Sequence, residues 1–130
     1  MSKLNKLQKF EALKTLPNVF EFPENIKGSW HSEVFNNNKP IILELACGKG
    51  DYTLAMSKLY PNKNFIGIDI KGARIWKGAV SAHEQKLNNA CFLRIYIEQL
   101  TDYFEKKEIS EIWITFPDPF IKKSKRRKRL

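Results

Sequence analysis

From residue 40 onward, short apolar runs alternate with longer segments in which apolar positions recur every three or four residues. The short runs predict strands and the longer segments predict helices. Such alternation is typical of parallel strands joined by helices, so we expect an α/β fold. The predicted strands are 41–46, 64–70, 91–96 and 111–116, and the predicted helices are 51–59, 73–87 and 98–106.

The first 39 residues follow a different pattern. Leucine and phenylalanine recur every third residue among lysines between positions 4 and 16, which predicts an amphipathic helix over 3–16 that ends before Pro17. Residues 18–40 mix aromatic side chains with proline, glycine and three consecutive asparagines, which predicts an irregular, partly packed arm. We therefore divide the chain into an N-terminal helix and irregular arm, 1–39, and an α/β domain, 40–130.

The pattern stops after four predicted strands, whereas doubly wound sheets usually contain five or more. We therefore expect the chain to be the first part of a longer protein. A sheet that stops there would leave an apolar strand edge uncovered.

The 130 residues have a formal net charge of +9, and this charge is unevenly placed. Lysine and arginine dominate residues 122–129, where there is no acidic residue, so we expect a nucleic-acid partner that binds there. The two cysteines and two histidines are isolated from one another, which argues against a metal site and a disulfide framework. We find neither a signal peptide nor a membrane-spanning run, so we expect a cytoplasmic protein without a membrane partner.

A glycine turn follows the first predicted strand and lies between two acidic residues. Gly48 and Gly50 leave the backbone open to a ligand, and Asp69 lies 19 residues further on, a spacing that suits hydrogen bonds to ribose hydroxyls. Glu44 would repel a pyrophosphate but attract an ammonium group. Thr53 stands where dinucleotide-binding enzymes prefer a third glycine, so an NAD-linked enzyme is a weak alternative.

A third acidic residue comes just after the fourth predicted strand. Asp118 is held between Pro117 and Pro119, which stiffen the backbone, and it should emerge at the same end of the sheet as Gly48 and Asp69. We therefore expect Asp118 beside the reactive end of a cofactor, with the basic run close by.

These motifs together resemble bacterial tRNA (guanine-N7)-methyltransferase. The resemblance is carried by residues 44–50, 65–69, 112–119 and the basic run that follows. It implies a Rossmann-like S-adenosylmethionine-dependent methyltransferase fold, of which this chain would hold the N-terminal part of a mainly parallel sheet with flanking helices. It also implies methylation of guanine N7 in tRNA, with S-adenosyl-L-methionine as cofactor and tRNA as partner.

The resemblance also assigns roles to single residues, with Asp118 as the catalytic residue. Tyr96 falls where the family often has an acidic residue near the cofactor's adenine. Because the family continues beyond the matched region, we expect this chain alone to be inactive. The implied cofactor contacts are Glu44, Gly48, Gly50, Asp69, Tyr96 and Asp118, and the implied substrate contacts are Lys122, Ser124, Lys125, Arg126, Arg127, Lys128 and Arg129.

Guanine N7 has a lone pair in the neutral base, so its methylation requires positioning rather than a general base. Two alternatives remain open. A methyltransferase for an exocyclic amine would use an acid followed by paired prolines and an aromatic residue, and residues 116–120 lack the paired prolines. A non-catalytic RNA-binding module would use the basic run alone. The sequence does not indicate the oligomeric state or the modified tRNA position.

Overall fold

A computed structural model describes residues 4–114, and these residues form one five-stranded parallel sheet between helices. The expected fold class is therefore confirmed. The elements in chain order are α1 (Lys6–Ala12), η1 (Leu13–Thr15), β1 (Val19–Glu21), η2 (Trp30–Phe35), β2 (Ile41–Leu45), α2 (Asp51–Leu59), β3 (Asn64–Asp69), α3 (Gly72–Glu84), β4 (Ala90–Arg94), η3 (Ile97–Gln99), α4 (Leu100–Tyr103) and β5 (Glu111–Ile114).

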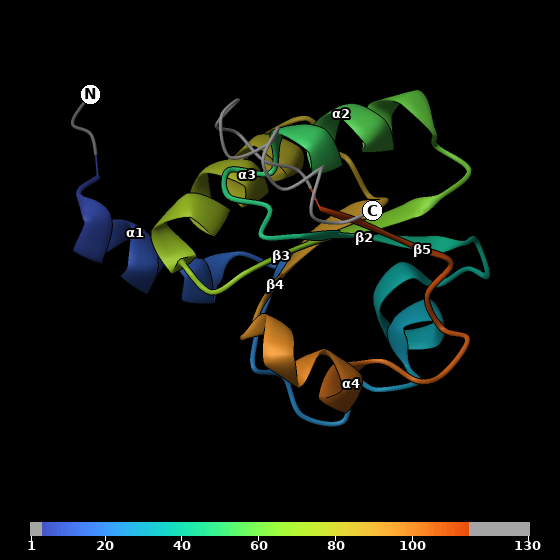
Figure 1. Cartoon of the computed structure of the whole chain (residues 1–130). Helices are drawn as coiled ribbons and strands as arrows, with labels where there is room; N and C mark the ends of the chain where they lie inside the picture. Colours follow the sequence, from blue (N-terminus) through green and yellow to red (C-terminus); the bar gives the residue numbers. More distant parts are fainter. Residues whose placement is uncertain (1–3, 115–130) are drawn as a thin grey trace, which may run out of the picture.

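The helices lie in two layers, one on each face of the sheet. Figure 1 shows α2 and α3 on one face, with α1 beside α3, and α4 and η2 on the other. Alternate residues of β2 point to the two faces, so Ile41, Leu43 and Leu45 belong to the core under η2 and α4. Glu44 therefore points to the opposite face, the side of α2 and α3.

The strand order β1-β4-β3-β2-β5 has a reversal at β2. The chain moves from β2 outward through β3 to β4, and then returns to add β5 on the other side of β2. In open parallel sheets, ligands bind beyond the carboxyl ends of the strands at such a reversal. The turn that follows β2 occupies that position.

Most of the predicted elements from residue 40 onward are present, with α2 at the expected bounds. The predicted helix 98–106 is instead two short helices, η3 and α4, that end at Tyr103. The predicted helix over 3–16 is shorter, with α1 beginning at Lys6 after an Asn5 cap, whose side chain accepts a hydrogen bond from the Gln8 backbone amide (2.8 Å).

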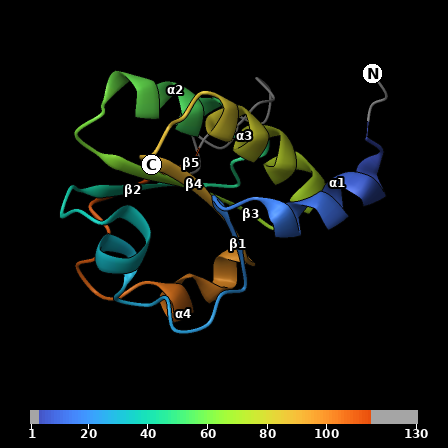
Figure 2. The same ribbon diagram turned by 180° about the vertical axis from the view of Figure 1, so that it is seen from behind.

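The arm before residue 40 is not uniformly irregular, which corrects one expectation. Figure 2 shows β1 beside β4, and Val19 is paired with Phe92 in a parallel register. Three residues are too few to show the alternation that marks a strand in a sequence. The structure therefore extends the sheet into the arm, while the division into two parts at residue 39 remains a prediction.

Trp30 fixes the second half of the arm in the core. Its ring is fully buried and stacks on Phe104, with ring centroids 5.1 Å apart. Its indole nitrogen donates a hydrogen bond to the carbonyl of Tyr103 (2.8 Å), and its backbone amide donates one to the buried carboxylate of Glu108 (3.1 Å). Residues almost 80 positions apart are thus joined by aromatic and polar contacts.

Cys47 and Cys91 are both buried and neither is in a disulfide. No three His, Cys, Asp or Glu side chains of residues 4–114 are grouped so that they could hold a metal ion. The same stretch contains no helix that is long and apolar enough to cross a membrane.

Candidate functional site

A cavity of about 910 Å³ lies beyond the carboxyl ends of β2 and β3, and we call it the carboxyl-end cavity. Its floor comes from β2, β3 and the glycine turn, and its walls come from α1, α2 and α3. The lining residues are Lys6, Lys9, Glu44, Ala46, Cys47, Gly48, Lys49, Asp51, Tyr52, Asp69, Ala73, Arg74 and Lys77.

Glu44 lies at the floor of this cavity and is only 3% exposed. Its Oε1 accepts hydrogen bonds from the hydroxyl (2.7 Å) and the backbone amide (3.2 Å) of Thr53, in the first turn of α2. A helix N-terminus and a buried hydroxyl both stabilise a carboxylate. Thr53 therefore fixes the position of Glu44, a role that the sequence analysis missed because it considered Thr53 only as a replaced glycine.

Asp69 lies at the end of β3 and is 8% exposed. One carboxylate oxygen accepts a hydrogen bond from the Gly48 amide (2.8 Å), and the other accepts one from the Lys71 amide (2.9 Å). Each carboxylate oxygen has a second lone pair, so both can still accept a ligand's hydroxyl. Asp69 thus ties the glycine turn to β3 while it lines the cavity.

The two predicted glycines have different surroundings. Gly48 has φ +58°, and a Cβ added there would meet no atom within 4 Å. The space beside the Gly48 backbone is therefore open, and a side chain at this position would occupy it. Gly50 has φ +75°, and a Cβ added there would lie 2.6 Å from the Phe92 ring. Gly50 is therefore required for packing, and it is not among the lining residues.

Tyr96 lines a smaller side cavity of about 480 Å³. Ile95 and other residues that follow β4 also line it, together with Ala46 and Asp69. Asp69 and Ala46 line both cavities, so the two are adjacent. Tyr96 is 55% exposed and its ring lies 6.1 Å from that of Phe22, between centroids. The structure thus places Tyr96 on the far side of Asp69 from Glu44.

The floor of the carboxyl-end cavity is electrostatically negative. Burial, followed by the charges of Glu44 and Asp69, raises the pKa of the Cys47 thiol well above its usual value. Partial burial, followed by Glu44 and Glu111, also raises the pKa of Tyr52. A negative floor favours a ligand whose inserted end is cationic.

The predicted catalytic residue and the predicted substrate contacts lie outside the described residues. Their roles therefore stay predictions. These residues are Asp118, Lys122, Ser124, Lys125, Arg126, Arg127, Lys128 and Arg129.

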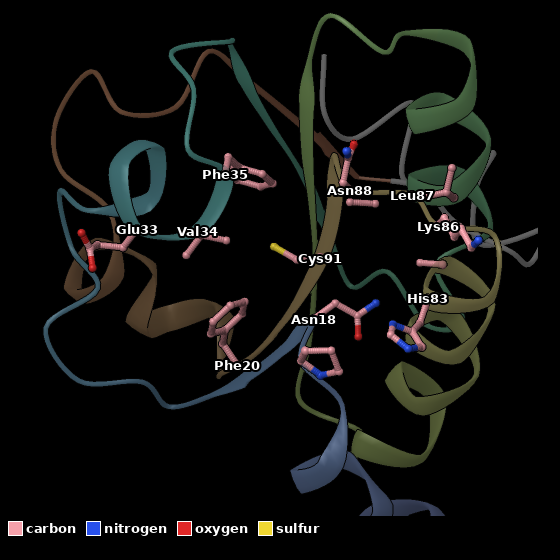
Figure 3. Close-up of a pocket in the computed structure, with 13 residues that line it drawn as sticks. Asn18, Phe20, Glu33, Val34, Phe35, His83, Lys86, Leu87, Asn88 and Cys91 are labelled. Atoms are coloured by element: carbon pink, nitrogen blue, oxygen red, sulfur yellow. The ribbon is translucent and has the colours of Figure 1, made fainter.

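A further cavity of about 540 Å³ lies at the other end of the sheet, and we call it the amino-end cavity. Figure 3 shows it between η2 and the end of α3, with Phe20, Val34, Phe35 and Cys91 facing it. Its lining is mainly apolar, and no acidic residue ends a strand there. Ligands of parallel sheets bind at the opposite end of the strands, so we place the functional site in the carboxyl-end cavity.

Comparison with known proteins identifies the family. Residues 38–130 match the model of a protein family described as "Putative methyltransferase". The chain belongs to this family. Membership confirms the expected methyltransferase fold class and agrees with the prediction of S-adenosylmethionine as cofactor.

Several curated relatives are named tRNA (guanine-N(7)-)-methyltransferase. The relative from Bacteroides fragilis is 47% identical over 131 residues, which cover 95% of this chain and 52% of the relative. The one from Christiangramia forsetii is 47% identical over 138 residues, covering 100% of this chain and 62% of the relative. The chain thus spans about half the length of the curated relatives it matches.

Solved structures support the fold at low sequence identity. The antibiotic-resistance methyltransferase Kmr matches with a TM-score of 0.50 and 14% identity, covering 92% of this chain and 52% of Kmr. The crystal structure of WbdD matches with a TM-score of 0.51 and 18% identity, covering 79% of this chain and 27% of WbdD.

Proposed function

We propose that the protein methylates guanine N7 in tRNA and takes the methyl group from S-adenosyl-L-methionine. One observation supports the cofactor most strongly. Glu44 and Asp69 lie at the carboxyl ends of β2 and β3, Tyr96 follows the neighbouring strand β4, and the three line two adjacent cavities in that order.

This order matches the order of groups in the cofactor. The Glu44 carboxylate would bind the ammonium group of the methionine part, since it is buried on the negative floor. Asp69 would accept hydrogen bonds from the ribose hydroxyls, and Tyr96 would lie along the adenine in the side cavity. The open space at Gly48 leaves room for the ligand beside the backbone.

The cofactor supplies an electrophilic methyl group, and the protein's part is to position the acceptor. Neutral guanine N7 already has the lone pair that attacks, so no proton must be removed first. We propose that Asp118 accepts hydrogen bonds from donors on the guanine edge and thereby directs N7 toward the cavity. The basic residues 122–129 would hold the RNA backbone nearby, at a cytoplasmic location where tRNA is present.

The names of the relatives support guanine N7 and tRNA as the target. At 47% identity over the matched half, the chain shares with them the region that contains the glycine turn and Asp118. Neither alternative has this support, since an exocyclic-amine enzyme would differ in its motif and a non-catalytic module would not need Glu44 and Asp69.

A methyl-transfer assay with unmodified tRNA and radiolabelled S-adenosylmethionine tests this proposal. The chain is assayed alone and fused to the part of the Christiangramia forsetii relative that the match does not cover. We expect the fusion to label tRNA and the product to break at one guanosine after borohydride and aniline, which cleave at N7-methylguanosine. Label without cleavage would favour the exocyclic-amine reaction, and RNA binding without label would favour the non-catalytic module.

A further inference from the structure

The rim of the carboxyl-end cavity carries the opposite charge from its floor. Five cationic side chains line the cavity, and they come from three separate segments: α1, the glycine turn and α3. We call them the basic rim. They are Lys6, Lys9, Lys49, Arg74 and Lys77.

The basic rim is not neutralised by ion pairs within residues 4–114. The two salt bridges found there join Lys14 to Glu11 and Arg94 to Glu21, and so involve none of the five cations. On the cavity floor, Glu44 accepts hydrogen bonds from Thr53 and Asp69 accepts them from backbone amides, so these bonds do not come from the rim cations. A third acid, the exposed Asp51, also lines the cavity.

Helix packing brings these cations together across more than 60 residues of sequence. A Cβ added at Gly72, the first residue of α3, would lie 2.6 Å from Leu13 and 2.9 Å from Phe10, so the α1 segment and α3 are in close contact. The ammonium of Lys9 also lies 5.5 Å from the centre of the Trp76 ring of α3. Like charges gathered around one cavity repel one another, and a bound anion reduces this repulsion.

The cofactor cannot account for five cations, because it has a single carboxylate. A free nucleotide that entered deeply would place its phosphates against the Glu44 and Asp69 carboxylates. A nucleic-acid backbone that crosses the mouth would meet the rim cations, with Asp51 as the one exposed acid among the lining residues. Its repeated phosphates match several cations from different segments.

We propose that the basic rim binds the phosphate backbone of RNA as it crosses the mouth of the carboxyl-end cavity. This RNA surface is formed by α1, the glycine turn and α3, and it is separate in sequence from the basic residues 122–129. The inference rests on the proposed function, since the bound RNA would be the tRNA substrate. A base displaced from a strand held there would face the negative floor where the cofactor is proposed to bind.

Binding of tRNA at several salt concentrations tests the surface. The rim variant combines Lys6→Gln, Lys9→Gln and Lys77→Gln, which spares Lys49 and Arg74. The control variant combines Lys27→Gln, Lys58→Gln and Lys106→Gln, three exposed lysines that do not line the cavity, so it loses the same net charge. Affinity for S-adenosylhomocysteine is measured on each protein in parallel.

We expect the rim variant to flatten the slope of log affinity against log salt by about two units, and to bind tRNA about tenfold more weakly at moderate salt. The control variant should flatten this slope by no more than half as much as the rim variant does, and it should keep its affinity for S-adenosylhomocysteine. Equal slopes in the rim and control variants would overturn the rim while the proposed function stood. Absence of tRNA binding by the unchanged chain would overturn both.

Discussion

The carboxyl-end cavity lies beyond the ends of β2 and β3, whereas the amino-end cavity lies beside β1 and the start of β4, and the two differ in what they can hold. The carboxyl-end cavity has two buried carboxylates on its floor and lysines at its rim. The lining of the amino-end cavity is mainly apolar, and its polar members include Asn18, Glu33 and His83 (Figure 3). Both are hollow, so hollowness alone does not identify a site. Buried charged side chains that hydrogen bonds hold in position are a better indication of a functional site.

The two cavities also differ in the contacts that hold their lining residues in place. At the carboxyl end, hydrogen bonds to backbone amides and to Thr53 hold the acids in position, and glycine leaves the space free. At the amino end, the Asn18 side chain donates a hydrogen bond to the carbonyl of Ala79 (2.9 Å) and so joins the start of β1 to α3. That contact joins two elements of the fold. We therefore expect substitutions at the two ends to affect different measurements.

We expect the largest effect in the free energy of unfolding, where the two glycines of the turn should differ. Gly50→Ala should lower the free energy of unfolding by about 2–4 kcal/mol, because a left-handed residue acquires a Cβ that overlaps the Phe92 ring. Gly48→Ala should cost only about 1 kcal/mol, since its Cβ meets no atom. Urea denaturation of the two variants measures both values. Equal losses would show that the turn is not packed as described.

A smaller effect should appear in ligand affinity. Asp69→Ala should weaken the binding of S-adenosylhomocysteine by about 1–3 kcal/mol, because the ribose hydroxyls lose a charged acceptor. The matched change in the amino-end cavity, Glu33→Ala, should leave that affinity unchanged. Isothermal titration calorimetry measures both variants. If Glu33→Ala weakened binding as much as Asp69→Ala, the assignment of the ligand to the carboxyl end would be wrong.

Loss of the Thr53 hydroxyl should weaken the binding of S-adenosylhomocysteine by about 1 kcal/mol. Thr53→Val keeps the shape of the side chain but removes the hydroxyl that donates to Glu44 (2.7 Å). Thr53→Ser keeps the hydroxyl and should restore most of the affinity. Calorimetry with the two variants distinguishes a positioning role from simple packing, because a packing role would make the serine variant the weaker binder.

The two cysteines give the most sensitive comparison, because each lines one of the cavities. Burial raises the pKa of both thiols, and the carboxylates of the floor raise that of Cys47 further. S-adenosylhomocysteine should slow the alkylation of Cys47 several-fold and that of Cys91 much less. Mass spectrometry of timed samples measures each rate, and equal slowing of the two would argue against a ligand beside Cys47.

The same raised pKa values predict a dependence of stability on pH. A thiol in the unfolded chain ionises near pH 8.5, whereas both thiols stay protonated in the folded chain above that pH. The unfolded state therefore binds fewer protons in this range, so the free energy of unfolding should fall as pH rises above about 8.5. Replacing both residues with alanine should reduce this slope, as urea denaturation at pH 7 to 10 would show.

Much of the fold could be predicted from periodicity. Strands β2 and β3 are buried and nearly continuous in apolar residues, and α2 follows a glycine turn, so their bounds were close to those observed. The short strand β1 could not be found, because three half-buried residues show no alternation. The buried acid Glu108 gave no signal either, since two of the backbone amides that donate to it, those of Gly28 and Trp30, are distant in sequence.

The candidate site was predictable in part, for a physical reason. Glu44 and Asp69 end strands, and parallel strands bring such ends to one edge of the sheet. The partnership of Thr53 with Glu44 depends on the rotation of α2 over β2. The basic rim depends on the packing of α1 against α3. Neither contact is encoded in local spacing, so only the structure reveals them.

The central claim is that the carboxyl-end cavity binds the amino-acid part of the cofactor through Glu44. Its most direct test is calorimetry with S-adenosylhomocysteine and with 5′-methylthioadenosine, which lacks the amino-acid part, on the unchanged protein and on Glu44→Gln. We predict that the unchanged protein binds S-adenosylhomocysteine more tightly by about 1–3 kcal/mol, and that Glu44→Gln removes most of this difference. Equal affinities for the two ligands in the unchanged protein, or a difference that survives in Glu44→Gln, would contradict the account.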